Sequence, residues 1–238
     1  MLLDSLRGTI LALGDLAYPN GSRANFIECY HPHWGRHLNR TMPVPGNHDY
    51  ETPGAGAYFT YFDESAGIPG LGYYSFMRAG WLILALNSEV PMGEGSAQLG
   101  WLRGQLIAWP AGCTLAYWHR PLFSSGPNGN NPDVRPLFRA LYDAGADLVL
   151  AGHEHSYERF APQDPEQRAD PTRGIRQIVV GTGGARLTPL FGARRMNSEA
   201  QGSEWGVLRL TLSSGGYQWE FVPVAGGAFR DSGSAQCH

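Results

Sequence analysis

Four short blocks of this 238-residue chain place side chains that can bind metals or transfer protons directly after an apolar run. The blocks are Gly14-Asp15, Gly46-Asn47-His48-Asp49, Trp118-His119 and Gly152-His153-Glu154-His155. Imidazole suits zinc, iron and manganese, an amide oxygen is a neutral ligand, and a carboxylate can bridge two cations. Two cations about 3.5–4 Å apart can hold a phosphoryl group between the attacking and leaving oxygens. This set of residue types therefore favours hydrolysis of a phosphate ester.

Each block is a weak signal by itself. A strand-end aspartate such as Asp15 is commonly a turn former, and a single histidine such as His119 is more often a structural residue than a ligand. His153 and His155 are separated by one residue, so in an extended segment they point to the same side, which favours metal binding. The prediction rests on the joint occurrence of the four blocks.

The elements around these blocks predict an α/β domain. Strands are expected at residues 9–13, 72–77, 81–86, 113–118, 147–151, 174–181, 206–212 and 216–222. Helices are expected at residues 96–109, with Ser96 as the N-cap, and 133–144, with Asp133 as the N-cap. Ligands of open α/β sheets bind at the carboxyl ends of the strands, so the four blocks are expected to line one pocket.

Composition excludes several classes of function. All 18 basic residues are arginine, which excludes a Walker-type phosphate loop and Schiff-base chemistry. The net charge of −3 and the absence of a basic tract argue against nucleic acid and membrane partners. No apolar run approaches the roughly 18 residues of a membrane span. The length fits a single domain over residues 1–238.

The ordered motifs resemble those of the calcineurin-like metallophosphoesterases, and in particular their purple acid phosphatase branch. The GDxxY, GNH[DE], VxxH and GHxH blocks of that family are similar to Gly14–Tyr18, Gly46–Asp49, Ala116–His119 and Gly152–His155. The resemblance covers about residues 9–222 of the sequence. It implies a four-layer α/β/β/α sandwich with two mixed sheets and with metals at the strand ends.

The resemblance also implies a dinuclear centre of iron, zinc or manganese. Asp15 would be the bridging carboxylate, and the second metal site would be completed by Asn47, His119 and His153. Tyr18 and His155 would serve the first site, where a tyrosinate would favour ferric iron and give a charge-transfer colour.

The activity implied is hydrolysis of phosphomonoesters by a metal-bound hydroxide, with His48, Asp15 and Asn47 as the catalytic residues. His48 would contact the phosphate and act as general acid toward the leaving alkoxide. Arg120 either counters phosphate charge or pairs on the surface. Two alternatives stay open, a phosphodiesterase with the same centre and a truncated remnant with weak activity.

The sequence departs from the family at its beginning. The family's DxG block normally precedes GDxxY by several tens of residues, whereas only 13 residues precede Gly14, and Asp4 lacks the glycine. An N-terminally truncated domain is therefore expected, with a weakened first metal site and unpaired strand edges that favour a homodimer. Cys237 could pair with Cys29 or Cys113, or stay free. The chain shows no signal peptide, although the resemblance suggests a secreted or periplasmic protein.

Overall fold

The computed structural model describes residues 2–110, 112–190 and 192–238. Its strands are β1 (Ile10–Leu13), β2 (Thr41–Val44), β3 (Tyr74–Arg78), β4 (Trp81–Ala85), β5 (Cys113–Trp118), β6 (Leu148–Ala151), β7 (Tyr157–Phe160), β8 (Arg176–Val180), β9 (Ser198–Gly202), β10 (Gly206–Ser213), β11 (Gly216–Pro223) and β12 (Ser232–Gln236). Its α-helices are α1 (Leu2–Ser5), α2 (Arg23–Asn25), α3 (Gly56–Phe62), α4 (Ala97–Ala108) and α5 (Arg135–Asp143). Short 3₁₀ segments occupy Gly35–Arg40, Asp49–Glu51, Pro53–Ala55, Asp63–Ala66 and Pro132–Val134, and a π turn occupies Phe26–Tyr30.

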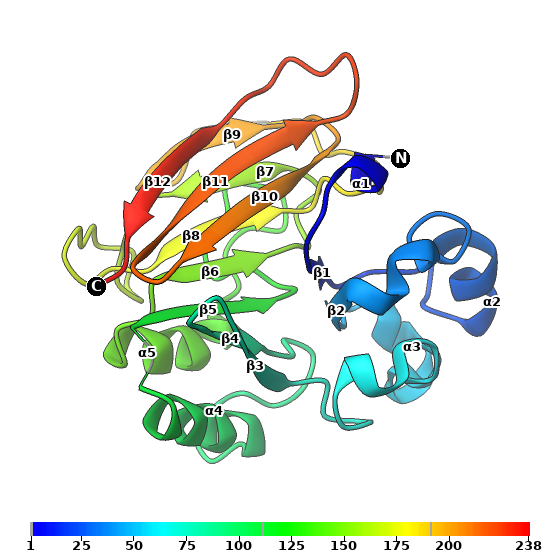
Figure 1. Ribbon diagram of the computed structural model, residues 1–238, viewed down its shortest axis with the longest axis horizontal. Coiled ribbons are helices and arrows are strands. Elements are labelled where there is room, and N and C mark those ends of the chain that lie inside the picture. The colour runs from blue at the N-terminus through cyan, green and yellow to red at the C-terminus, as the bar shows by residue number, and fades with distance from the viewer. Residues whose placement is uncertain (1, 111, 191) are drawn as a thin grey trace.

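Seven of the strands form one mixed sheet in the order β3-β4-β5-β6-β8-β7-β9 (Figure 1). Strands β4, β5, β6 and β8 run parallel, while β3 and β7 are antiparallel to their neighbours. An antiparallel sheet, β10-β11-β12, and a parallel pair, β1-β2, complete the strands. The two expected sheets are thus three in the described chain. The reason is that β1 pairs only with β2 there, so no strand ladder joins it to β10.

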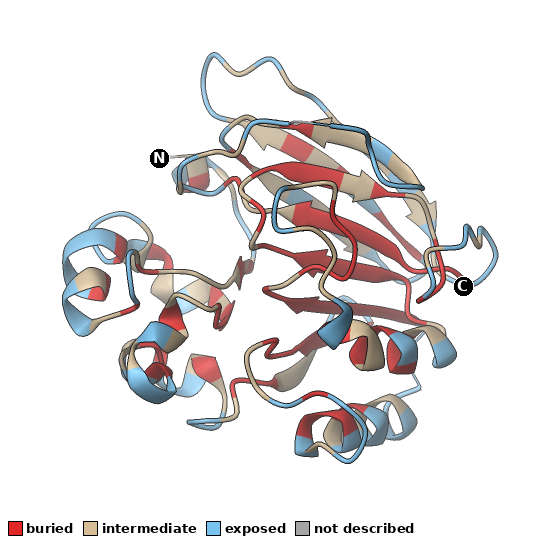
Figure 2. Cartoon of the chain, turned by 180° about the vertical axis from the view of Figure 1, so that it is seen from behind, coloured by how far each residue is buried: buried red, intermediate tan, exposed pale blue. Residues whose placement is uncertain are grey.

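The central strands β4, β5 and β6 of the large sheet are buried on both faces, whereas the edge strands β3 and β9 are partly exposed (Figure 2). Alternation along β4 directs Leu82 and Leu84 toward α4 and α5, and Trp81 and Ile83 toward the smaller sheets. The helix-side core also contains Leu99, Leu102, Trp118, Leu137, Phe138 and Val149. The opposite core also contains Val44, Tyr117, Leu150, Tyr157, Tyr217, Trp219 and Phe221. Because the β1–β2 pair packs into this second core, the loops that follow β1 and β2 are fixed against the large sheet.

The fourth layer of the expected sandwich is only partial. The π turn Phe26–Tyr30 and helix α3 share an aromatic core of their own with Phe26, Tyr58 and Phe62, next to β2 (Figure 1). On β10, in contrast, Arg209 and Thr211 are exposed on the outward face. The expectation of a complete outer helical layer is therefore wrong for β10–β12, where polar outward residues meet solvent.

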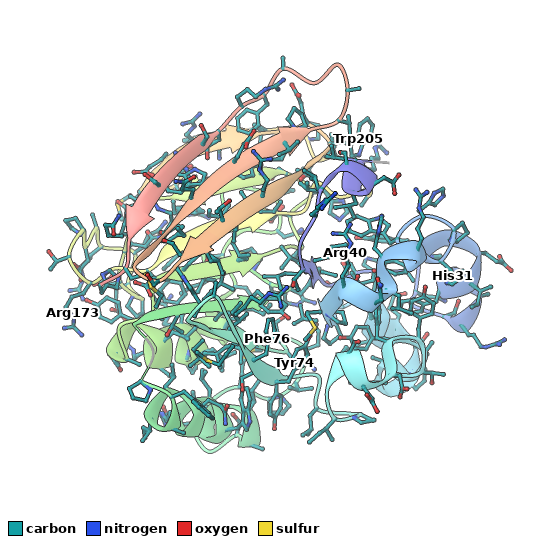
Figure 3. The ribbon with its side chains drawn as sticks, viewed as in Figure 1. His31, Arg40, Tyr74, Phe76, Arg173 and Trp205 are labelled. Carbon is teal, nitrogen blue, oxygen red and sulfur yellow. A yellow bond between two sulfur atoms is a disulfide. The ribbon has the colours of Figure 1, made fainter. Side chains whose placement is uncertain are left out.

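Tyrosine hydroxyls attach the β1–β2 pair to the large sheet. Tyr74 on β3, labelled in Figure 3, donates its hydroxyl to the carbonyl of Pro43 at 2.8 Å. Tyr117 on β5 donates to the carbonyl of Met42 at 3.2 Å. Both carbonyls belong to β2, and these hydrogen bonds place the end of β2 beside the ends of the parallel strands.

Of the two predicted helix N-caps, one is confirmed and one is wrong. Ser96 caps α4 as predicted, because its hydroxyl accepts the backbone N–H of Leu99 at 3.2 Å. The expected cap at Asp133 is wrong. The side chain of Asn131 accepts the backbone N–H of Asp133 at 3.3 Å and starts a 3₁₀ turn, and α5 begins only at Arg135.

The chain ends are held covalently and by hydrogen bonds. Cys113 at the start of β5 forms a disulfide with Cys237, and their Cα atoms are 5.5 Å apart. Cys29 is exposed and free. The disulfide selects one of the three possibilities that the sequence left open. No helix within the described ranges is long and apolar enough to span a membrane.

Candidate metal centre

Left-handed backbone at the strand ends turns the candidate ligands toward one point. After β1, Gly14 has φ +85° and Asp15 has φ +54°, and after β6, His153 has φ +66°. Such values are uncommon for residues other than glycine and concentrate at functional sites. A Cβ on Gly14 would lie 2.6 Å from Nδ1 of His119, and one on Gly46 would lie 2.3 Å from Oδ1 of Asp15. Glycine at both positions therefore permits the close approach of the loops.

The inner part of the site is centred on Nε2 of His119. This atom lies 3.1 Å from Oδ2 of Asp15, 3.2 Å from Oδ1 of Asn47 and 3.1 Å from Nδ1 of His153. The His119 side chain is 1% exposed and that of Asp15 is 5% exposed, so water does not surround this group. Four strand ends, those of β1, β2, β5 and β6, thus supply one atom each to a common point.

The proton count at this point favours a cation. Nδ1 of His119 donates to the carbonyl of Leu13 at 2.8 Å, which leaves Nε2 of the neutral imidazole as a lone pair. Two oxygen acceptors face that lone pair, Oδ2 of Asp15 and Oδ1 of Asn47, together with Nδ1 of His153, which donates or accepts according to its tautomer. A proton on Nε2 can satisfy only one of these acceptors at a time, whereas a metal ion binds all of them. The donor set present therefore fits a metal ion.

The pKa values leave Asp15 and His153 in forms that bind metals, whereas the pKa of His119 is shifted toward its protonated form. Burial would raise the pKa of Asp15, but the hydrogen bond and charge of His119 outweigh it and hold the pKa at about 2. Burial, together with the charge of His119, lowers the pKa of His153 to about 3. Burial also lowers the pKa of His119, but the hydrogen bond and charge of Asp15 give a net upward shift. Asp15 is consequently a carboxylate and His153 a neutral imidazole.

An outer pair of side chains adjoins the inner group. The hydroxyl of Tyr18 lies 2.9 Å from Nε2 of His155 and 3.3 Å from Oδ2 of Asp15. Nδ1 of His155 lies 2.9 Å from the carbonyl of Arg186, so Nε2 of its neutral imidazole is the lone pair that faces Tyr18. Burial and the charge of Asp15 raise the pKa of Tyr18. In the absence of a cation, Tyr18 is therefore a neutral phenol.

His48 lies at the rim of the centre. Its backbone N–H donates to Oδ1 of Asp15 at 2.8 Å, and its ring centroid is 4.7 Å from that of Tyr18. Nδ1 lies 2.5 Å from the carbonyl of Pro19 and 3.0 Å from Oε1 of Glu51. Since the carbonyl can only accept, Nδ1 carries the proton, and Nε2 is the nitrogen able to exchange one with a bound molecule.

Asp49 joins the loops after β1 and β2. Its fully buried carboxylate accepts the backbone N–H of Gly46 at 2.9 Å and that of Leu16 at 3.3 Å. Burial raises its pKa to about 7, helped by the neighbouring charge of Asp15. The geometry makes Asp49 a support that holds the Asp15 and Asn47 loops together.

The six metal-ligand candidates named from the sequence lie in one continuous cluster. They are Asp15, Tyr18, Asn47, His119, His153 and His155. Asp4 is not part of the cluster, because its carboxylate pairs with Arg36 and His37, each at 3.2 Å. In the described residues, the only group of three or more His, Cys, Asp and Glu atoms at this place is Asp15, His119 and His153.

Sequence reasoning missed Glu89 beside the centre. Glu89 accepts Nε of Arg120 with both carboxylate oxygens, at 2.9 and 3.1 Å. Of the two alternatives for Arg120, the ion pair is therefore present, although its guanidinium is largely buried rather than on the open surface. The signal was available, since Glu89 follows the end of β4 as the predicted ligands follow theirs.

Comparison with known sequences places the chain among phosphoesterases. Residues 7–157 match the family model described as calcineurin-like phosphoesterase. Purple acid phosphatase 15 of Arabidopsis thaliana is 29% identical over 216 residues, which cover 74% of this chain and 40% of that protein. Purple acid phosphatase 23 of the same plant is 26% identical over 221 residues, covering 77% and 48%. The chain thus spans less than half the length of these relatives.

Comparison with solved structures gives the same fold. Purple acid phosphatase PPD1 from yellow lupin (Lupinus luteus) seeds superposes with a TM-score of 0.81 at 19% identity, over 98% of this chain and 47% of that one. GAP50, described as the anchor in the inner membrane complex of Plasmodium, superposes with a TM-score of 0.76 at 16% identity, over 97% and 79%. The family model covers well over half of the sequence, and this chain therefore belongs to the calcineurin-like phosphoesterase family.

Proposed function

We propose that the protein is a metal-dependent phosphatase that hydrolyses phosphomonoesters at the cluster around His119. The observation that carries the proposal is the convergence of Asp15, Asn47, His119 and His153 on one buried point, where two oxygen acceptors and an imidazole nitrogen surround Nε2 of His119. Family membership supports the hydrolase class. The fold alone does not, because GAP50 shares it and is described as an anchor.

Two adjoining metal sites are proposed. Asn47, His119 and His153 would hold one ion, Tyr18 and His155 would hold the other, and Asp15 would bridge them. Iron, zinc and manganese all suit these ligands. When bound, the ions would supply positive charge to the phosphoryl group and lower the pKa of the attacking water. Tyr18 would have to lose its proton to bind a metal, which favours a trivalent ion at that site.

We propose that His48 protonates the leaving alcohol. The carbonyl of Pro19 holds the ring through Nδ1, and the side chain is 32% exposed, so Nε2 can reach a molecule bound at the rim. A protonated Nε2 would donate to the departing oxygen as general acid. The Asp15 carboxylate that accepts the His48 backbone N–H would keep this loop at a fixed distance from the inner group.

The decisive test is hydrolysis of p-nitrophenyl phosphate by protein stripped with chelator and then titrated with zinc, manganese, iron or magnesium. Turnover should return with metal in the wild type and stay absent in His119→Ala. Bis-p-nitrophenyl phosphate, assayed in parallel, should react more slowly, and the reverse preference would make the protein a phosphodiesterase. Protein that binds metal but hydrolyses neither ester at any pH would refute the proposal and favour a catalytically weak remnant.

A further inference from the structure

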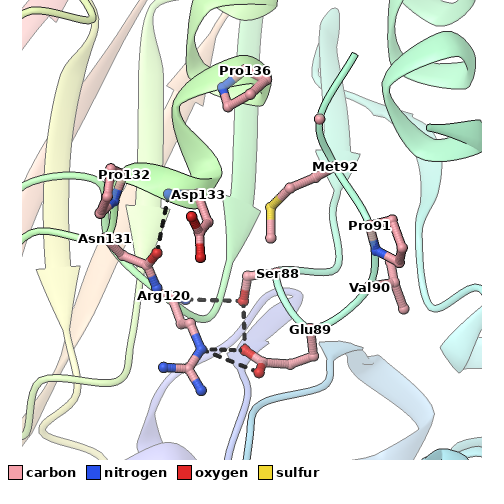
Figure 4. A pocket seen from close by; sticks show the side chains of 11 residues that line it. Ser88, Glu89, Val90, Pro91, Met92, Arg120, Asn131, Pro132, Asp133 and Pro136 are labelled. Atoms are coloured by element: carbon pink, nitrogen blue, oxygen red, sulfur yellow. Dashed lines mark hydrogen bonds and ion pairs between the residues drawn. The ribbon is translucent and has the colours of Figure 1, made fainter. Parts of the chain in front are cut away.

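A cavity of about 670 Å³ lies next to the proposed metal centre (Figure 4). Its wall is formed by the segment after β4, by the residue that follows His119, and by the start of α5. Its polar groups come from Ser88, Glu89, Arg120 and Asp133, and its apolar surface includes Met92 and Pro132. None of the six proposed metal ligands lines it. The cavity is therefore a separate compartment beside the centre.

The cavity and the centre share the Arg120 segment. Arg120 directly follows His119, and its backbone N–H donates to Oγ of Ser88 at 3.1 Å. Nε of Arg120 in turn donates to both carboxylate oxygens of Glu89 at 2.9 and 3.1 Å, so the ion pair of these two side chains lies beside the centre. The part of a phosphate ester that projects from the centre on this side would enter the cavity.

The charges of the cavity wall do not cancel. Arg120 and Glu89 neutralise each other through the two hydrogen bonds from Nε, and Ser88 adds a further bond to Glu89 at 3.0 Å. The carboxylate of Asp133 points toward this pair from the opposite side, as Figure 4 shows. No hydrogen bond or ion pair engages that carboxylate within residues 2–110, 112–190 and 192–238. The wall therefore presents one unpaired negative charge.

Asp133 is exposed to solvent, and apolar groups lie beside it on the cavity side. Met92, Pro132 and Pro136 lie around Asp133 in Figure 4, and Met92 is buried although it lines the cavity. A surface that combines one carboxylate with thioether and proline methylenes suits an alkylammonium group, which carries positive charge and apolar CH groups together. An acidic group would meet repulsion from the same carboxylate.

We propose that this cavity receives the alcohol portion of the substrate and selects phosphomonoesters whose alcohol carries an ammonium group over those whose alcohol carries a carboxylate. The inference rests on the proposed phosphatase function and adds a substrate class to it. Asp133 is the specificity-determining residue, and the neutral Arg120–Glu89 pair separates its charge from the metal centre. Asp133 has no role in bond breaking.

The test compares kcat/KM for phosphocholine with that for 3-phosphoglycerate in the metal-loaded protein. The wild type should favour phosphocholine, and Asp133→Asn should lower the ratio of the two values by about 3- to 10-fold, because one exposed carboxylate both attracts the ammonium group and repels the carboxylate. p-Nitrophenyl phosphate, which carries no charge on its alcohol, should change less than twofold. Asp143→Asn is the matched control, because it removes the same charge from the far end of α5.

A binding measurement separates this inference from the proposed catalysis. Choline chloride titrated into metal-free protein and followed by NMR should bind the wild type at least threefold more tightly than Asp133→Asn. If Asp133→Asn hydrolyses p-nitrophenyl phosphate and has the same ratio of kcat/KM for phosphocholine and 3-phosphoglycerate as the wild type, the inference is overturned. The proposed phosphatase function would not be affected by that result. If the metal-loaded wild type hydrolyses none of the esters but still binds choline more tightly than Asp133→Asn does, the proposed phosphatase activity is refuted. The cavity would then remain as a binding site for an organic cation.

Discussion

Two largely buried polar clusters of this molecule each contain an aspartate and differ in the groups that face it. One is the proposed metal centre at the ends of β1, β2, β5 and β6. The other lies between β7, β11 and the segment before β12, where Asp231 accepts four bonds. Its donors are the Tyr157 hydroxyl at 2.6 Å, Nε and Nη2 of Arg159 at 2.7 and 3.0 Å, and Nε1 of Trp219 at 3.1 Å.

The difference lies in what remains unsatisfied. Around Asp231 every acceptor has a donor, and the Arg159 guanidinium also lies over the Trp219 ring at 4.9 Å from its centroid. At the metal centre, Nε2 of His119 faces two oxygen acceptors, from Asp15 and Asn47, and a nitrogen of His153, so one proton on Nε2 cannot satisfy both oxygens at once. Buried polar groups are ordinarily paired, so a group left short of protons calls for an explanation outside the chain. The balanced cluster therefore stabilises the fold, and the unbalanced one points to a bound cation.

The largest expected effect is on activity at the unbalanced cluster. His119→Ala should lower metal-dependent kcat/KM by about 10³-fold, equivalent to about 4 kcal/mol in the barrier, because it removes the atom on which the other ligands converge. It should also abolish the stabilisation by added metal, which for the wild type should reach about 3 kcal/mol at a hundredfold excess over Kd. Enzyme assays and thermal melts measure both quantities.

His33→Ala is the control for this prediction, because His33 is exposed and outside the cluster. It should leave turnover and the metal-induced rise of Tm unchanged. A His119→Ala protein that still gains stability from metal would break the comparison, since the proton-poor cluster would then not be the metal site.

The next effect concerns the disulfide, which closes a loop with a sequence separation of 124 residues. Replacing Cys113 and Cys237 together by serine should lower the free energy of unfolding by about 2–4 kcal/mol, because the unfolded chain gains freedom. Turnover at 25 °C should be retained, since the bond lies at the opposite ends of the strands from the metal centre. Urea unfolding measures the loss, and Cys29→Ser should change stability by less than about 0.5 kcal/mol.

The disulfide also depends on a strand, β12, that could not be predicted from the sequence. Pairing depends on β12, whose segment Ser232–Gln236 is polar and has no apolar alternation. It forms a strand because its backbone pairs with β11, and because Gly233 leaves room for the ring of Trp219, which a Cβ would approach to 2.3 Å. Neither cause is visible in the local pattern, so no strand was predicted after residue 222.

The candidate site was predictable because its signals are local. Asp15, Asn47, His119 and His153 each follow an apolar strand, and parallel strands bring such ends together. The outer layer and the cap of α5 were not predictable in the same way. An exposed β10 face depends on what packs against it, and Asn131 rather than Asp133 caps because the turn begins two residues earlier. Residue type and strand order predicted which side chains converge, while tertiary context decided the boundaries of the elements.

The balanced cluster should respond in stability and not in activity. Arg159→Met keeps much of the volume but removes two bonds and the charge from Asp231, and should cost about 1–3 kcal/mol in the free energy of unfolding. Arg209→Met is the control, because Arg209 forms an exposed pair with Glu220 on β10 and β11. It should cost at most about 0.5 kcal/mol. Equal losses of unfolding free energy in both variants would show that burial of Arg159 adds nothing to its contribution to stability.

The smallest expected effect is the contribution of Asp231 to the pH dependence of the free energy of unfolding. Burial would raise its pKa, but the hydrogen bonds from Arg159 and Tyr157 outweigh it, and the pKa in the folded protein lies below the ordinary value of 3.8. The folded state therefore releases this proton more readily than the unfolded chain. The resulting stabilisation is complete above about pH 5 and is lost as the pH falls through the folded pKa.

Asp231→Asn removes this contribution, so the difference in unfolding free energy between wild type and variant should narrow as the pH falls from 5 to 3. Urea unfolding in the presence of chelator measures it without interference from metal release. Asp15 has a lowered pKa too, but it is present in both proteins and its effect cancels in the difference. A difference that stays constant or widens toward low pH would mean that Asp231 is not held as a carboxylate by its donors, and the contrast between the two clusters would lose its basis.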